Sequence, residues 1–245
     1  PMHTPLWSLG PVAIFALTGS LAAGQDAAKP RFENGEAQVV EAFKDRKNWE
    51  QFHLWVETEF DSDGDGKKDR MHVDVTVPGQ CMSEGLKVPV IYNTSPYFWG
   101  TSGTSEEFFW NPDHEVGAKP PERPHPPEIE RKDFRPLNST RYIRQFVPRG
   151  FAVVHSASPG TGYSQGCPTI GADNESLAPK AVIDWLNGRA RGFTAATGGD
   201  PVEATWCTGK VGMIGTSFNG TLPLAAATTG VEGLEAIIPV APNTS

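Results

Sequence analysis

Strand-like and helical segments alternate through the C-terminal part of the chain, and this order constrains the fold more than any other feature. Apolar runs typical of buried strands occupy residues 88–93, 150–155, 210–214 and 236–241, and helical segments occupy residues 140–147, 177–186 and 219–229. The helix at 177–186 has its apolar residues on one face and stops at Asn187-Gly188. Because strands that alternate with helices form βαβ units, we predict an α/β protein with a mainly parallel sheet.

Two further strand-like segments, residues 52–60 and 71–77, come before this alternating region. The second alternates apolar and polar side chains and is rich in valine. The residues between them are mostly Asp, Gly and Lys, so the two strands are predicted to form an antiparallel hairpin at the entrance to the sheet. Residues 25–50 show no clear pattern and are treated as an N-terminal extension, with the main domain at 51–245.

The turn of this hairpin carries three alternating carboxylates, Asp61, Asp63 and Asp65, followed by Gly66. This resembles the beginning of a calcium-binding loop. However, the twelfth position is His72 rather than the bidentate Glu, and no helices are predicted on either side. The alternative is an acidic turn whose glycines serve the backbone. We therefore predict no metal or cofactor and keep calcium as the alternative at this turn.

The chain is acidic, with a net charge of −8 over 245 residues, and has no cluster of Lys and Arg. Nucleic acids and anionic membrane surfaces bind clustered positive charge, so neither is an expected partner.

The N-terminal segment is typical of a secretory signal peptide, predicted to span residues 1–24. Residues 6–17 are apolar and uncharged, and small residues follow at 20–24. The apolar run is too short to cross a bilayer, which needs about 20 apolar residues. Because no Lys or Arg precedes it, an N-terminal anchor or a different start remains the alternative. The protein is expected to be secreted or extracytoplasmic.

Three cysteines, Cys81, Cys167 and Cys207, fit an exported protein with one disulfide and one free thiol. Cys167 and Cys207 are the preferred pair because both flank the apparent catalytic half of the chain, which contains the segment of greatest chemical interest. Three unpaired thiols are the equally acceptable alternative.

That segment is the run from Gly215 to Gly220, which contains Ser217 between an apolar strand and an Ala-rich helix. A serine on a sharp strand-to-helix turn can act as a nucleophile, because the helix N-terminus and nearby N–H groups stabilise the oxyanion. Such a turn needs small residues close to the serine. Gly215 meets this need, whereas Asn219 stands where the usual G-x-S-x-G has glycine, and Asn tolerates positive φ. The alternative is a serine that caps a helix in a non-catalytic Rossmann-like fold.

Four segments resemble the Xaa-Pro dipeptidyl-peptidase family, whose wider group includes cocaine-esterase-like acyl hydrolases. They are residues 181–189, residues 208–222 around Ser217, the Gly-rich turn 159–166, and the Ser95-Pro96-Tyr97 sequence after an early strand. The resemblance extends from about residue 55 to residue 245. It implies the α/β-hydrolase fold, here with a mainly parallel sheet and an antiparallel N-terminal hairpin.

The resemblance also implies an activity and three roles. Ser217 would attack the carbonyl group after a penultimate proline and form an acyl-enzyme, so that N-terminal Xaa-Pro dipeptides are released from a peptide substrate. The phenolic O–H of Tyr97 and the backbone N–H of Phe218 would stabilise the oxyanion. An ester or acyl hydrolase of the wider group is one alternative, and a non-catalytic hydrolase-like domain is the other.

The remaining triad residues are not evident in the chain. In this fold the order is Ser, then acid, then His, but no Asp or His follows Ser217. His155, at the end of a strand, is the one local candidate among the preceding histidines, and we interpret it as structural. The family carries a helical cap and a β-sandwich domain further along. We therefore expect this chain to be an N-terminal portion, truncated after the strand that follows the nucleophile helix.

Overall fold

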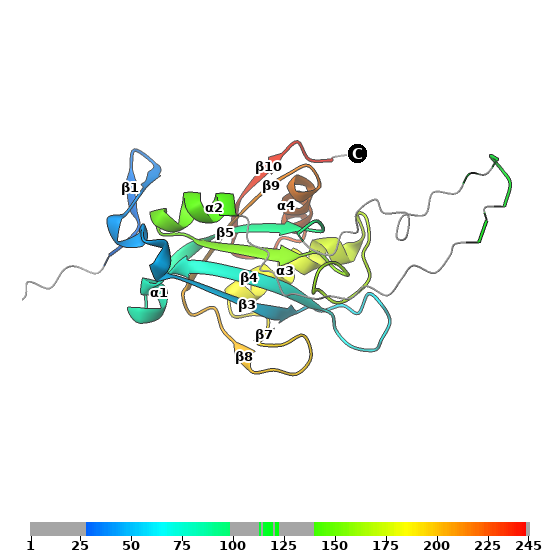
Figure 1. Ribbon diagram of the computed structural model, residues 1–245, viewed down its shortest axis with the longest axis horizontal. Coiled ribbons are helices and arrows are strands. Elements are labelled where there is room, and N and C mark those ends of the chain that lie inside the picture. Colours follow the sequence, from blue (N-terminus) through cyan, green and yellow to red (C-terminus); the bar gives the residue numbers. More distant parts are fainter. Residues whose placement is uncertain (1–27, 99–112, 114, 120, 123–139, 244–245) are drawn as a thin grey trace, which may run out of the picture.

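The computed structural model describes residues 28–98, 113, 115–119, 121–122 and 140–243. The predicted signal peptide at 1–24 lies outside the described residues. The described chain is built around one sheet of eight strands, in the order β10-β9-β5-β6-β4-β3-β7-β8 (Figure 1).

Four neighbouring strands of the sheet are parallel and correspond to the four predicted apolar runs. They are β5 (Val88–Ser95), β6 (Ala152–Ala157), β9 (Cys207–Thr216) and β10 (Leu234–Val240). The predicted hairpin is also confirmed, because β3 (Trp49–Glu57) pairs antiparallel with β4 (Arg70–Pro78), and β4 pairs antiparallel with β6. The predicted α/β-hydrolase fold class, with its antiparallel entrance, is confirmed.

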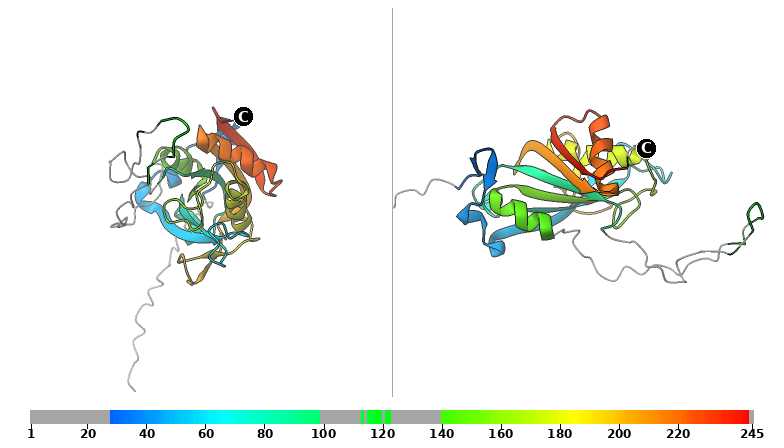
Figure 2. Two further views of the ribbon diagram at one scale, coloured as in Figure 1. Left: turned by 90° about the vertical axis from the view of Figure 1, so that its right-hand side faces the viewer. Right: turned by 90° about the horizontal axis from the view of Figure 1, so that it is seen from above.

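Helices cover both faces of this sheet, as the two rotated views show (Figure 2). On one face lies α2 (Thr140–Phe146), whose Ile143 packs in a small cluster with Val153 of β6. On the other face lie α3 (Asp173–Leu186) and α4 (Phe218–Thr228). The next residue of β6, Val154, belongs to the core cluster under α3. This switch of face between adjacent valines is the period of two that a strand imposes.

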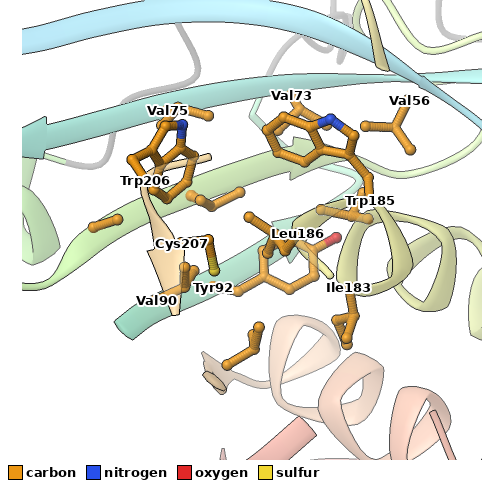
Figure 3. Close-up of a cluster of buried hydrophobic side chains, with 14 of the residues drawn as sticks. Val56, Val73, Val75, Val90, Tyr92, Ile183, Trp185, Leu186, Trp206 and Cys207 are labelled. Atoms are coloured by element: carbon orange, nitrogen blue, oxygen red, sulfur yellow. The ribbon is translucent and has the colours of Figure 1, made fainter. Parts of the chain in front are cut away.

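The main core lies between the sheet and α3 (Figure 3). Trp185 of α3 extends toward Val73 of β4, and Trp206, just before β9, packs edge-on against Trp185 at 6.2 Å between ring centroids. The Trp185 indole nitrogen donates a hydrogen bond to the carbonyl of Val202, so its polar atom is satisfied inside the core.

Several short elements were not predicted. The extension contains β1 (Arg31–Glu33) and β2 (Glu36–Gln38), followed by two 3-10 turns at Glu41–Phe43 and Arg46–Asn48. A further 3-10 turn, Val147–Arg149, follows α2, and a four-residue α1 (Gln80–Ser83) follows β4. The sheet also gains β7 (Gly192–Phe193) and β8 (Pro201–Val202) at its edge beyond β3.

The preferred disulfide is wrong, because Cys81, Cys167 and Cys207 are all unpaired. Cys207 is buried at the amino end of β9, whereas Cys167 is exposed on the turn after the carboxyl end of β6. Because these strands run in the same direction, the two cysteines lie at opposite edges of the sheet.

Candidate active site

Ser217 lies at a sharp turn between β9, which ends at Thr216, and α4, which begins at Phe218. Its backbone has φ of 61° and ψ of −127°, a conformation that residues other than glycine rarely adopt. The side chain is exposed to solvent. Backbone strain of this kind costs about 1–3 kcal/mol and gathers at functional sites. The geometry is that of a nucleophile elbow, which presents a serine hydroxyl above the end of a sheet.

Two glycines make this turn possible because α4 lies close to the neighbouring strands. A Cβ atom on Gly215 would lie 1.9 Å from the carbonyl oxygen of Asn219, and one on Gly220 would lie 2.7 Å from that of Val240. Asn219 itself has a helical backbone and no positive φ, so the tolerance of Asn for positive φ is not used here. The second small residue is needed at Gly220, where α4 crosses β10.

We expect Gly215→Ala to destabilise the protein by about 3 kcal/mol or to prevent folding, since the methyl group would collide with backbone atoms that cannot rotate away. The control is Gly212→Ala in the same strand, where the nearest atoms to a new Cβ lie at 3.9 Å. Urea unfolding of both variants measures the difference. Equal midpoints for the two variants would show that the close approach of α4 to β9 does not limit the residue at Gly215.

The backbone N–H groups of Ser217 and Phe218 differ in their availability to a substrate. The N–H of Ser217 donates to the carbonyl of Val240 at 2.9 Å, so it is not available to a substrate. Phe218 opens α4, and the N–H groups of a first helical turn have no acceptor within the helix. The Phe218 amide is therefore the candidate oxyanion donor from this segment, at the positive end of the helix dipole.

Tyr97 lies next to this position. Its ring centroid is 6.0 Å from that of Phe218 in an edge-on contact, and its side chain is 60% exposed. The backbone N–H of Tyr97 donates to the hydroxyl of Ser95 at 3.0 Å, so this N–H is already engaged. The candidate donor of Tyr97 is therefore its phenolic hydroxyl. The structure thus brings Tyr97, Ser217 and Phe218 to one end of the sheet.

His155 lies inside the sheet. It is 0% exposed, and its ring contacts the ring of Phe98 at 5.4 Å between centroids. Burial lowers the pKa of His155 from 6.5 to about 4, because a charged imidazole is poorly solvated there. Burial also lowers the pKa of His72 to about 3, with a smaller effect from nearby His53. His3, His114 and His125 lie outside the described residues.

Acidification below pH 6.5 is expected to weaken the fold through His155. In the unfolded chain this histidine takes up a proton near pH 6.5, whereas the folded protein resists it down to about pH 4. The stability is thus complete above pH 6.5 and falls as the pH drops, by about 1.4 kcal/mol per pH unit. We expect His155→Gln to lose part of the difference in unfolding free energy between pH 7 and pH 5, measured in urea. If His155→Gln leaves this difference in unfolding free energy unchanged, His155 is not a cause of the loss of stability at low pH.

The acidic turn brings the carboxylate oxygens of Asp61, Asp63 and Asp65 within 4.8 Å of one another on the surface. The Asp61 carboxylate already accepts hydrogen bonds from the backbone N–H groups of Gly64 and Gly66, at 2.8 and 2.9 Å. The turn therefore satisfies its own carboxylates, as an acidic hairpin turn does, and both interpretations of the segment remain open.

Among the described residues, no helix is long and apolar enough to cross a membrane.

Comparison with known proteins identifies the family. Residues 63–245 match the family described as X-Pro dipeptidyl-peptidase (S15 family). A Rhodopirellula baltica protein named "Putative Xaa-Pro dipeptidyl-peptidase" is 60% identical over 234 residues, which is 96% of this chain and 37% of that protein. An Xaa-Pro dipeptidyl-peptidase of Lacticaseibacillus rhamnosus is 39% identical over 76% of this chain and 26% of its own length.

Among solved structures, an alpha-amino acid ester hydrolase superimposes with a TM-score of 0.49 at 16% identity, over 91% of this chain and 28% of that one. The chain thus spans about a third of the length of the curated relatives that it matches. The match over residues 63–245 covers most of the chain, and the chain therefore belongs to the X-Pro dipeptidyl-peptidase (S15) family.

Proposed function

We propose that this chain carries the nucleophile of a serine peptidase that releases Xaa-Pro dipeptides from the N-terminus of peptides. The observation that carries the proposal is Ser217, exposed and strained between β9 and α4 in a chain of this family. A serine held in this way can attack a carbonyl carbon and form an acyl-enzyme, which water then hydrolyses. The preference for proline comes from the family and the names of the relatives.

The oxyanion that forms during this attack needs donors that are already in place. We assign this role to the Phe218 amide and the Tyr97 hydroxyl, and the assignment is supported by the contact between the rings of Tyr97, in the loop after β5, and Phe218, the residue after Ser217. Each such donor contributes a few kcal/mol to the stability of the transition state, because it is oriented before the charge develops.

The general base must be a second group that takes the proton from Ser217. None of the three described histidines is placed to do this, since His155 and His72 are fully buried in the sheet and His53 lies on β3, which β5, β6 and β4 separate from β9. The curated relatives are much longer than this chain, and we propose that the histidine and the acid of the triad come from that additional length.

The test compares two substrates with the full-length protein. A Gly-Pro p-nitroanilide should be hydrolysed, and a Gly-Ala p-nitroanilide should react far more slowly, since only the first has the penultimate proline. A short-chain p-nitrophenyl ester measures the alternative acyl-hydrolase activity. Hydrolysis of the ester without any cleavage of the Gly-Pro amide would contradict the peptidase proposal and support the ester hydrolase.

We also propose that the protein is exported, because residues 6–17 are apolar and small residues follow at 20–24. Expression of the full-length protein in a bacterial host, with N-terminal sequencing of the extracytoplasmic fraction, tests this. A product that stays in the cytoplasm with residues 1–24 intact would contradict it.

A further inference from the structure

The strands that lead to Tyr97 and Ser217, β5 and β9, are neighbours whose pairing ends before their carboxyl ends. On the side away from β9, β5 stays paired with β6 as far as Ser95. On the side away from β5, β9 stays paired with β10 as far as Thr216. Between β5 and β9, however, the register ends at the pair Tyr92 and Met213. The chain also leaves the two strands in opposite directions, from β5 to β6 and from β9 to β10. A crevice for ligands forms in open α/β sheets at such a point.

Asn93 is the first residue of β5 beyond the point where pairing with β9 ends. Its side-chain Nδ2 donates a hydrogen bond of 2.5 Å to the carbonyl oxygen of Ile214 in β9. Asn93 is 4% exposed, so this bond is shielded from water. Ile214 immediately precedes Gly215, at the base of the elbow. The amide side chain thus links the two strands where they begin to separate.

We propose that Asn93 is a positioning residue for the hydrolytic reaction, a role that rests on the proposed function. Its hydrogen bond sets the separation of β5 and β9, and thereby places the Tyr97 hydroxyl opposite the position that the oxyanion takes above Ser217. Asn93 does not contact the substrate in this proposal. It acts through the two strands, and its effect is on the rate of the chemical step rather than on substrate binding.

The proposal depends on how sensitive an oxyanion site is to distance. Without the amide, the carbonyl of Ile214 loses a buried donor, and the strands can separate further. A displacement of about 1 Å in a catalytic group can lower a rate by about 100-fold. We therefore expect Asn93→Leu, which keeps the size of the side chain but not the donor, to lower kcat by 10-fold to 100-fold with little change in KM.

The matched control is Thr94→Val, one residue further along β5. Thr94 is also buried, at 3% exposure, and this variant removes the two hydrogen bonds of its hydroxyl. Its hydroxyl bonds to Ser156 of β6, however, and so lies on the side of β5 away from the elbow. We expect Thr94→Val to keep kcat within threefold of the wild type. Asn93→Ser is the milder variant if Asn93→Leu does not fold.

The measurement is kcat and KM for the Gly-Pro anilide with the full-length protein, together with a cycle that includes Tyr97→Phe. If Asn93 acts by placing the Tyr97 hydroxyl, Asn93→Leu costs little once that hydroxyl is gone, so the two effects do not multiply. If the role of Asn93 is merely structural, Asn93→Leu lowers kcat by the same factor whether residue 97 is tyrosine or phenylalanine.

Two results would overturn the inference and leave the proposed function intact. In the first, the wild type is active, and Asn93→Leu or Asn93→Ser has the same kcat as the control Thr94→Val. The other is full multiplication of the Asn93 and Tyr97 effects. A wild type that hydrolyses neither amide nor ester, and whose Ser217 is not labelled by a fluorophosphonate, would overturn both the proposed function and the inference.

Discussion

Replacement of Ser217 by alanine is expected to lower kcat for the Gly-Pro anilide by about a million-fold, the scale typical for loss of a catalytic serine. The reason is that the Ser217 hydroxyl, held between β9 and α4, is the group that forms the acyl-enzyme, and alanine has no nucleophile to replace it. The same variant of the full-length protein should no longer be labelled by a fluorophosphonate. Steady-state hydrolysis and mass spectrometry of the labelled protein provide the two readouts.

The control is Ser83→Ala, which makes the same change at an exposed serine in α1. It should retain wild-type kcat and labelling. If Ser217→Ala keeps more than about 1% of the activity, or is still labelled, another residue is the nucleophile.

The strain at Ser217 adds a readout that does not depend on activity. Glycine adopts a φ of 61° without steric cost, whereas alanine and serine do not. Ser217→Gly should therefore be more stable than Ser217→Ala by about 1 kcal/mol in urea unfolding. A more stable alanine variant would mean that the elbow is not strained in solution.

The parallel strands and the hairpin were predictable because their apolar patterns are long enough to show a period. Strands β5, β6, β9 and β10 all contain runs of Val, Ile or Ala. Strand β7 has only two residues, Gly192–Phe193, which no period can identify. It forms through tertiary contacts, since the Arg70 guanidinium lies 3.6 Å from the centroid of the Phe193 ring.

The position of Ser217 in a strand-to-helix turn could also be predicted, but its packing could not. The sequence motif suggests that the second small residue belongs at Asn219, two positions after the serine. The requirement is set instead by Val240 of β10, whose carbonyl leaves no space for a side chain at Gly220. Such a contact joins residues 20 positions apart, and a local motif carries no information about it.

Asn93 shows the same limit more clearly. In the sequence it is the last residue of an apolar run and reads as an ordinary strand end. Its hydrogen bond to Ile214 depends on the register between β5 and β9, which are separated by more than 100 residues of chain. The wrong disulfide has a related cause, because the positions of Cys167 and Cys207 along the sequence do not reveal that the two residues lie at opposite edges of the sheet.

Replacement of Tyr97 by phenylalanine is expected to lower kcat for the Gly-Pro anilide by 100-fold to 1000-fold, the usual cost of one oxyanion donor. The aromatic contact with Phe218 is kept in this variant, so only the hydroxyl is removed. Because the oxyanion exists only after the attack of Ser217, substrate binding should change little, and KM should stay within about threefold. Steady-state kinetics of the full-length variant measure both constants.

The matched control is Tyr92→Phe, which removes a hydroxyl from β5, the strand that leads to Tyr97, on the side that faces the core. The Tyr92 hydroxyl is buried and lies 2.6 Å from that of Ser156, so its loss should lower the unfolding free energy by about 1 kcal/mol and leave kcat unchanged. Tyr97→Phe should show the opposite pattern, because its exposed hydroxyl contributes little to folding. If instead Tyr97→Phe raises KM at constant kcat, Tyr97 binds the substrate in its ground state, and the Phe218 amide needs a different partner for the oxyanion.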